Sequence, residues 1–324
     1  MPIVKERLHA RRLIDFMAEH HASLPIFCTA SHWNTEAILL AAKRIRDKYE
    51  LATVPVAVAM TFNYRYMAQA QRVTHTNSAK LGFLSIMDHL HILCDTPDSP
   101  YYGIQVLPHL DHADPEFDEW ALTEGSEYLA SAMFDAQRYP AETNQAMTRN
   151  YVKAYGDKLL IEGIMEELPV EGLHEKHDAA IDDYPERAKD YVAKTGIDFL
   201  VADLGTEQQS SSSKAHYKRE RARSVTAALG GKPMLVLHGT SSLTGEDFAG
   251  LPEDGVIRVN MWTKVARESG RYAASNLFRR APELYGDDFE AAESHRYLMD
   301  STEKAAEIFA EVMEKLNYQG LARP

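Results

Sequence analysis

Three titratable side chains stand close together in the segment 106–116, which reads VLPHLDHADPE. His109, Asp111 and His112 follow directly on the run 104–107, which is typical of a buried strand. A carboxylate between two imidazoles can combine a metal ligand with a group that transfers a proton. The same residues also fit the solvated polar end of a strand, so this segment alone leaves both interpretations open.

A further histidine stands in the same kind of position. His238 follows the apolar run 233–237, and the small or hydroxylated residues 239–242 (GTSS) come directly after it. If both runs are strands of one sheet, His112 and His238 can meet at one edge and bind a divalent metal of the zinc or cobalt kind. Backbone N–H groups of residues 239–242 can bind an anion. The alternatives are two unconnected histidines, among the 14 in the chain, and an ordinary turn.

Short apolar runs alternate with amphipathic segments along most of the chain, and these elements must position the reactive side chains. We predict strands at 25–29, 54–61, 104–109, 128–134, 158–161, 199–204, 233–237 and 256–261. We predict helices at 35–49, 78–94, 115–124, 140–155, 185–194, 218–229, 265–278 and 301–316, with a short helix after Thr244. Eight strand–helix units predict an α/β fold, a (β/α)8 TIM barrel. A doubly wound open sheet is the alternative, although no Gly-x-Gly-x-x-Gly motif follows the first strand.

The composition narrows the class of protein and its partners. We expect a single domain over residues 1–324, with an extra helical segment at 282–324. The 48 acidic residues exceed the 35 basic ones, for a net charge of −13, which argues against nucleic-acid and anionic-membrane partners. Two cysteines imply no disulfide framework. Without a membrane-length apolar run or a signal-peptide core, we expect a soluble, cytoplasmic protein.

Polar residues gather at the predicted carboxyl ends of the strands, where reactive groups lie in barrels of this kind. They are Ser31, Thr61, Asp111, His112, Asp135, Glu162, Glu207, Gln208, His238 and Asn260. Each of these, taken singly, is more often a cap or a loop residue than a catalyst. Their joint placement favours an active site.

Five segments carry a resemblance to a known enzyme family. They are 109–112 (HLDH), 124–135 (EGSEYLASAMFD), 195–206 (TGIDFLVADLGT), 233–241 (PMLVLHGTS) and 255–263 (GVIRVNMWT). In this order and spacing they resemble motifs of the class II, metal-dependent ketose-bisphosphate aldolases, such as fructose- and tagatose-bisphosphate aldolase. The resemblance implies a TIM barrel that makes or breaks a carbon–carbon bond beside a carbonyl, through an enediolate and with a divalent metal.

The resemblance also implies roles for individual residues. Asp111 matches the aspartate that exchanges a proton with the substrate hydroxyl at the cleaved bond. His112 and His238 match two of the three histidines that bind the metal. Candidates for contact with the substrate or its phosphate are Gly205, Gly239, Ser241, Asn260, Thr263 and Thr61.

This sequence departs from the family pattern around the metal. Gln208 stands where the third metal histidine is expected, and its amide oxygen is a weaker donor to zinc than imidazole. Ile164 replaces a metal-contacting glutamate, which leaves Glu162 as a candidate ligand beside Gln208. The loop that carries a base in the family reads PVEGL at 169–173, and Trp262 fills a position that is normally small or acidic. We still expect a divalent metal, with Zn²⁺ as the first choice.

These observations predict a class II aldolase-like lyase that acts on a ketose or sugar acid, with or without a phosphate. An epimerase or decarboxylase that uses the same enediolate is one alternative, because barrels change their chemistry by replacing loops. A degenerate, non-catalytic aldolase-like subunit is another. We expect a small sugar or sugar phosphate as the substrate and association into a homodimer or homotetramer.

Overall fold

Eight parallel strands form a closed barrel in the computed structural model, which describes residues 2–168, 183–207, 217–286, 290 and 296–322. The strands are β1 (Leu24–Cys28), β2 (Pro55–Thr61), β3 (Gln105–Ala113), β4 (Ser131–Phe134), β5 (Leu160–Ile164), β6 (Phe199–Val201), β7 (Leu235–Leu237) and β8 (Val256–Met261). Each strand pairs with the next along the chain, and β8 pairs with β1 to close the ring. This confirms the predicted (β/α)8 barrel.

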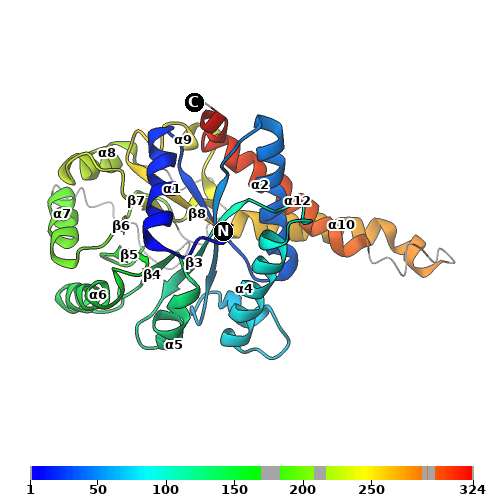
Figure 1. Cartoon of the computed structure of the whole chain (residues 1–324), viewed down its shortest axis with the longest axis horizontal. Helices are drawn as coiled ribbons and strands as arrows, with labels where there is room; N and C mark the ends of the chain where they lie inside the picture. Colours follow the sequence, from blue (N-terminus) through cyan, green and yellow to red (C-terminus); the bar gives the residue numbers. More distant parts are fainter. Residues whose placement is uncertain (1, 169–182, 208–216, 287–289, 291–295, 323–324) are drawn as a thin grey trace.

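Helices surround the barrel (Figure 1). They are α1 (Arg7–Glu19), α2 (His32–Tyr49), α3 (Gln69–Arg72), α4 (Ala79–Asp95), α5 (Glu119–Leu122), α6 (Ala141–Tyr155), α7 (Tyr184–Thr195), α8 (Arg219–Ala228), α9 (Gly245–Phe248), α10 (Thr263–Tyr285) and α12 (Arg296–Lys315). Three 3₁₀ helices, η1 (Glu124–Tyr128), η2 (Thr240–Ser242) and η3 (Tyr318–Ala322), complete the described elements. In that part of the chain, no helix combines the length and apolar character needed to cross a membrane.

Most predicted elements agree with the structure to within a few residues, but two strands differ in a way that affects the site. β3 continues four residues beyond the predicted end at His109, because its pairing with β2 extends to Thr61 opposite Asp111. Asp111 therefore lies within the strand instead of after it. The same correction applies to Glu162, which lies inside β5 because that strand continues to Ile164. Asn260 lies inside β8, whose bounds are as predicted.

The predicted helix 115–124 is wrong. Only Glu119–Leu122 is α-helical, and Glu124–Tyr128, part of which was predicted as strand, forms the 3₁₀ helix η1. Side chains compete for the backbone of this segment, because Asp114 Oδ1 accepts from the N–H of Glu116 at 2.8 Å. Asp118 Oδ2 in turn accepts from the N–H of Asp114 at 2.9 Å. Such local bonds favour a turn over a helix.

Helix α1, which the sequence pattern did not predict, is bound to the barrel by ion pairs. Arg7 and Arg11 both contact the carboxylate of Asp198, which lies just before β6, at 2.6 and 2.5 Å. Asp198 Oδ2 also accepts from the N–H of Ile161 in β5, at 2.9 Å. One partly buried carboxylate thus links the N-terminal helix to two strands.

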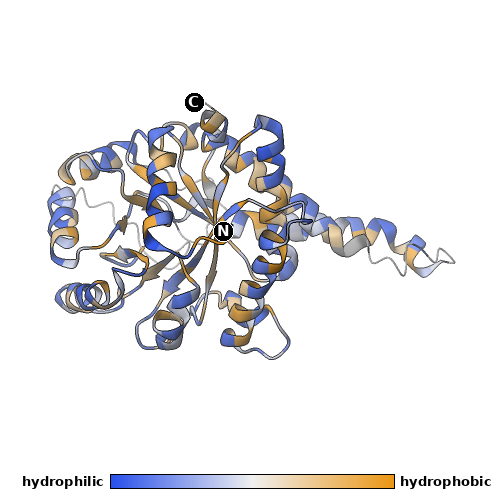
Figure 2. Cartoon of the chain, in the orientation of Figure 1, coloured by the Kyte–Doolittle hydropathy of each residue, from blue (hydrophilic) through white to orange (hydrophobic). Residues whose placement is uncertain are grey.

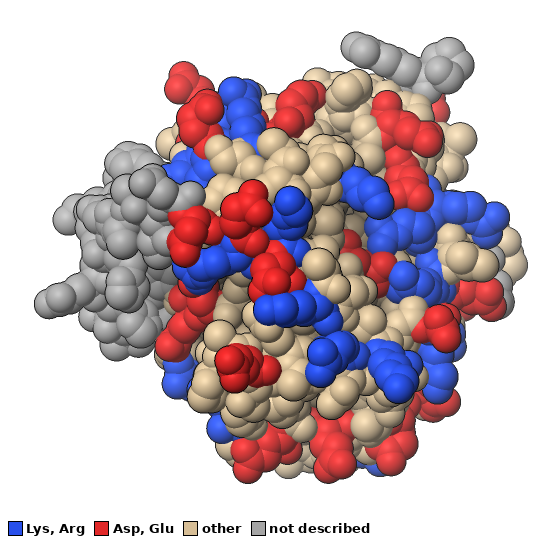
Figure 3. All heavy atoms as spheres, turned by 90° about the vertical axis from the view of Figure 1, so that its left-hand side faces the viewer, with Lys and Arg blue, Asp and Glu red and all other residues tan. Residues whose placement is uncertain are grey.

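Apolar residues are concentrated in the strands and on the inward faces of the helices, whereas the outward helix faces are hydrophilic (Figure 2). Acidic and basic side chains alternate over the face that Figure 3 presents. Helix α7, on that side of the molecule in Figure 1, carries the pairs Lys194–Asp190 at 2.7 Å and Arg187–Glu166 at 2.6 Å. Positive charge on this face is therefore interspersed with negative charge.

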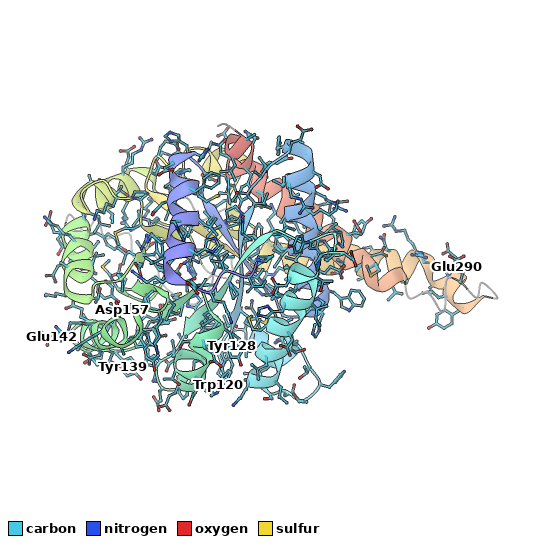
Figure 4. All side chains as sticks on the ribbon, viewed as in Figure 1. Trp120, Tyr128, Tyr139, Glu142, Asp157 and Glu290 are labelled. Atoms are coloured by element: carbon cyan, nitrogen blue, oxygen red, sulfur yellow. The ribbon has the colours of Figure 1, made fainter. Side chains whose placement is uncertain are left out.

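Helix α10 and the start of α12 project from the barrel as an arm (Figure 1), near whose tip Figure 4 labels Glu290. Two aromatic rings of α10 are largely uncovered, since Phe278 is 84% and Tyr285 is 92% exposed. The other end of α12 returns to the barrel, where Phe309 packs against Phe27 of β1 with ring centroids 4.3 Å apart. The arm is thus anchored at one end and exposed at the other.

Candidate active site

Three candidate residues meet at the carboxyl end of the barrel. Asp111 and His112 come from β3, and His238 follows β7. Their ligand atoms lie within 4.8 Å of one another, and all three side chains are buried. The structure therefore brings together residues that are more than 120 positions apart in the sequence.

The backbone at His112 is unusual and directs its side chain. Its φ is 47°, in the left-handed region that non-glycine residues rarely adopt, and the β3–β4 register shifts between Leu110 and Ala113. The Nδ1–H of His112 donates to Asp135 Oδ2 at 2.8 Å. The ring also stacks on Tyr64, with centroids 4.4 Å apart and planes 10° from parallel. Carboxylate and tyrosine together fix the imidazole, with Nε2 as its ligand nitrogen.

Charges in the cluster are set by burial and by close neighbours. Burial lowers the pKa of His238 to about 3, so its imidazole is neutral. Burial alone would raise the pKa of Asp111, but the imidazoles of His112, His238 and His109 lower it below its usual value. Burial lowers the pKa of His112, yet the carboxylates of Asp111 and Asp135 outweigh this effect and raise it. Asp111 is therefore ionised and His238 is not.

Two polar atoms of the cluster lack hydrogen-bond partners, and this observation tests whether the residues fit a metal ion. Among the described residues, His238 Nε2 and Asp111 Oδ1 are buried without any hydrogen bond. An unpaired buried polar atom costs about 1–3 kcal/mol, which a bound cation would relieve. Neutral imidazoles beside a carboxylate are donors that zinc and related divalent ions accept. The residues present fit such an ion, while Gln208 lies outside the described part of the chain.

Glu162 lies apart from this cluster. Its carboxylate pairs with Arg258 inside the barrel, and both side chains are fully buried. Its other oxygen lies 3.6 Å from His109 Nε2, and Ser131 Oγ contacts both His109 and Arg258 at 2.9 and 3.1 Å. We therefore place Glu162 in a charged layer beneath the site instead of among the metal ligands. Arg258, a charged residue within the apolar run 256–261, is the feature of the sequence that could have indicated this layer.

A pocket of about 70 Å³ opens above the cluster. It is lined by Thr61, Tyr64, Met67, Gln69, Asp111, His112, His238, Gly239, Thr240, Ser241, Asn260, Trp262 and Thr263. All the predicted substrate contacts line it except Gly205, whose N–H donates to Asp203 Oδ1 at 2.8 Å in the turn after β6. Sequence reasoning missed Tyr64, Met67 and Gln69, because the segment between β2 and α4 carries no clear periodic signal. Thr240 belongs to the segment 239–242 that the sequence indicated for an anion.

One end of this pocket is suited to an anion. Gly239 has φ +68°, and a Cβ at this position would lie 2.7 Å from the backbone of Glu207. Ser241 Oγ accepts from the N–H of Lys264, in the first turn of the 23-residue helix α10, at 3.0 Å. Asn260 Nδ2 is buried without a partner in the described structure. A helix N-terminus and an amide donor without a protein partner are groups that can bind phosphate.

Comparisons with known proteins identify the family and the fold. The sequence model of the family described as "Fructose-bisphosphate aldolase class-II" matches residues 9–321. A protein of Coccidioides immitis (strain RS) assigned as a fructose-bisphosphate aldolase is 27% identical over 315 residues, covering 90% of this chain and 93% of that protein. The structure resembles that of fructose-bisphosphate aldolase from Campylobacter jejuni, with a TM-score of 0.76 at 18% identity, covering 97% of this chain and 95% of the other. It also resembles the YdjI aldolase from Escherichia coli K12, with a TM-score of 0.66 at 16% identity over 99% and 100% of the two chains.

Proposed function

Because the chain belongs to the class-II fructose-bisphosphate aldolase family, we propose that it uses a divalent metal and Asp111 to break or form a carbon–carbon bond beside the carbonyl of a ketose phosphate. Family membership makes it an aldolase-like lyase. The observation that carries the finer proposal is the cluster of Asp111, His112 and His238, whose unpaired atoms lie at the pocket that also has the anion-binding end.

His112 and His238 would hold the metal, and Zn²⁺ is the ion we expect. When bound, a divalent metal supplies Lewis-acid polarisation of the substrate carbonyl. His112 is prepared for this by the bond from its Nδ1 to Asp135, which directs Nε2 to the pocket. His238 is neutral because of its burial, which is the form that binds metal.

Asp111 would move the proton. Its Oδ2 contacts Cys28 Sγ at 3.5 Å, whereas Oδ1 has no partner among the described residues. The neighbouring imidazoles lower the pKa of Asp111, so its carboxylate is ionised and ready to accept a proton. In cleavage, Oδ1 would take the proton of the hydroxyl beside the breaking bond, and in condensation it would return it. The electron pair would remain on the carbonyl half as an enediolate.

The phosphate of the substrate would lie at the other end of the same pocket. Gly239, Ser241 and Thr263 line that end, and Ser241 Oγ contacts the first turn of α10, whose N-terminus favours an anion. Asn260 Nδ2 would donate to a substrate oxygen, since it has no partner in the described structure. This arrangement fixes the carbonyl half and leaves the bond to be cleaved beside Asp111.

The rate of cleavage of a ketose phosphate tests this assignment. Replacement of Asp111 by Asn removes the proton acceptor and keeps the side-chain size, so we expect cleavage to fall by about 10²–10⁴-fold while the ketose phosphate still binds. Asp157→Asn is the matched control, because Asp157 is exposed and lies on the outside of the barrel near α6 (Figure 4). Undiminished cleavage in the Asp111 variant would exclude the proposed role.

We propose further that the protein is a cytoplasmic homodimer or homotetramer and that the projecting arm mediates association. Phe278 and Tyr285 expose aromatic rings, which soluble surfaces rarely leave uncovered in one segment. Helix α10 has five basic and two acidic residues, a net charge of 5 − 2 = +3, whereas the whole chain has −13. A basic, apolar arm thus complements an acidic second copy.

The mass of the particle in solution tests whether the arm mediates association. A Phe278→Ser, Tyr285→Ser double variant should behave as a smaller particle in light scattering than the native protein. Leu8→Ser is the control, because Leu8 is an equally apolar residue, 74% exposed on α1. A native protein that is already monomeric would refute the assignment.

A further inference from the structure

A second, larger pocket shares Tyr64 and His112 with the first. It has a volume of about 670 Å³ and is lined by Asn63, Tyr64, Arg65, His112, Asp114, Phe117, Asp135, Gln137, Arg138 and Glu167. These residues come from the loops after β2 to β5, whereas the anion-binding end belongs to the loops after β7 and β8. In a barrel with strands in consecutive order, the two pockets therefore lie on different sides of the metal cluster.

The charges of this second pocket are matched within the protein. Arg138 contacts Asp114 through Nε at 2.5 Å and through Nη2 at 3.1 Å, and it also contacts Glu116 at 2.5 Å. Arg65 Nη2 contacts Glu167 at 2.6 Å. Among the described residues, two arginines and three carboxylates, those of Asp114, Glu167 and Asp135, line the pocket, a net charge of 2 − 3 = −1.

This balance disfavours a phosphate. An incoming phosphate would meet an excess of negative charge and would have to displace carboxylates from both guanidinium groups. The first pocket differs, because Gly239, Ser241 and Thr263 line it at the first turn of α10. The N-terminus of a helix favours an anion. The described residues thus provide an anion-binding group on only one side of the cluster.

Aromatic rings and amides provide the other contacts of the second pocket. Phe117 is 59% exposed, with the guanidinium of Arg138 4.9 Å from its ring centroid, and the Tyr64 ring lies over His112. Asn63 and Gln137 contribute side-chain amides. Ring faces suit the C–H groups of a sugar-like chain, and each amide NH₂ has two N–H groups, enough for a hydroxyl as well as a protein partner.

We propose that this pocket receives the aldehyde half of the substrate and that this half has no phosphate, so that the substrate is a ketose monophosphate with a neutral, hydroxylated far end. The proposal rests on the bond cleavage at Asp111 put forward above. On cleavage, the hydroxyl beside the broken bond loses its proton to Asp111 and becomes the aldehyde. The bonding pair stays on the phosphorylated half, which takes a proton from water at the same carbon while Asp111 returns its proton to solvent, so no oxidant or reductant is needed.

Two substrates of the same carbon skeleton test the proposal. The holoenzyme should cleave fructose 1-phosphate with a kcat/KM about ten-fold or more above that for fructose 1,6-bisphosphate, because only the latter brings a second phosphate to the balanced pocket. Glu167→Gln releases Arg65 from its partner and should narrow this ratio several-fold. Glu186→Gln, on the surface of α7 and paired with Lys189, should leave the ratio unchanged. A native preference for the bisphosphate, or a ratio unaltered in Glu167→Gln, would overturn the proposal.

A separate measurement distinguishes failure of this proposal from failure of the proposed function. Cleavage of fructose 1,6-bisphosphate that is lost in Asp111→Asn requires the proposed chemistry but no neutral far end. Such cleavage together with a preference for the bisphosphate would reject the neutral aldehyde pocket alone. If neither fructose phosphate is cleaved, the proposed function fails, and saturation-transfer NMR still tests the pocket. We expect this measurement to detect bound glyceraldehyde in preference to glyceraldehyde 3-phosphate. The signal of bound glyceraldehyde should be lost in Phe117→Ala. A preference for glyceraldehyde 3-phosphate would reject the proposed neutral aldehyde pocket.

Discussion

Asp135 Oδ2 lies 2.8 Å from Nδ1 of His112, with both side chains buried at the carboxyl end of the barrel. A carboxylate in this place orients the ring and makes it a stronger donor to a metal. It also supports the left-handed backbone of His112, since the imidazole is fixed by a partner on the neighbouring strand end.

Replacement of Asp135 by Asn should weaken metal binding. The amide cannot support the imidazole as the carboxylate does, so we expect affinity for Zn²⁺ to fall by about 10–100-fold, as measured by competition with a chelator. Asp157→Asn, far from the site, should bind the metal with native affinity. Equal affinities in the two variants would show that Asp135 has no part in metal binding.

Replacement of Gln208 by histidine should strengthen metal binding. Imidazole is a better zinc donor than a neutral amide, so Gln208→His should raise the affinity for Zn²⁺ by roughly ten-fold or more. Isothermal titration with Zn²⁺ measures this, and Gln71→His serves as the control, because Gln71 bonds Asn63 away from the cluster. If Gln208→His binds no more tightly than the native protein, residue 208 is not a ligand position.

The charged layer beneath the site should be sensitive to removal of one partner. Arg258→Met leaves the buried carboxylate of Glu162 without its cation, and we expect a loss of about 3–5 kcal/mol in the free energy of unfolding. A Glu162→Gln, Arg258→Met double variant removes both charges and should be more stable than Arg258→Met alone. Urea denaturation of the two proteins checks the order, and a double variant weaker than the single one would contradict it.

A comparison of Gly239→Ala with Gly103→Ala separates the effect of backbone strain from that of a steric clash at the anion-binding end. The new Cβ would lie 2.7 Å from the Glu207 backbone, so the loop must shift and the KM for a ketose phosphate should rise by about ten-fold or more. Gly103→Ala is the control, because Gly103 also has a positive φ, +84°, but a Cβ there meets nothing within 4 Å. It should cost about 1 kcal/mol of stability and leave KM unchanged.

The barrel could be predicted because buried parallel strands leave continuous apolar runs and their covering helices leave a 3.6-residue period. Local hydrogen bonding was harder to foresee, as at Asp114 and Asp118, where side chains hold a turn that resembles a helix in sequence. The grouping of Asp111, His112 and His238 followed from their strand-end positions. The single-domain organisation over 1–324 stays a prediction.

Other parts of the site depend on tertiary structure that no local pattern encodes. Tyr64 belongs to an irregular loop, yet it stacks on His112 and forms a wall of both pockets. Arg258 was visible as a charge in an apolar run, but its partner Glu162 is 96 residues away. Sequence separation of this size hides a pair until the strands are in their final order.

The seam between β1 and β8 has a consequence for the order in which the molecule assembles. Leu24 pairs with Arg258 and Ile26 with Asn260 across it, so the two ends of the strand series must find each other before the ring is complete. Contacts between such distant segments form late and slowly. Asn260 and the charged layer at Arg258 therefore reach their final positions last. A refolding chain should regain its helices well before it regains a working catalytic centre.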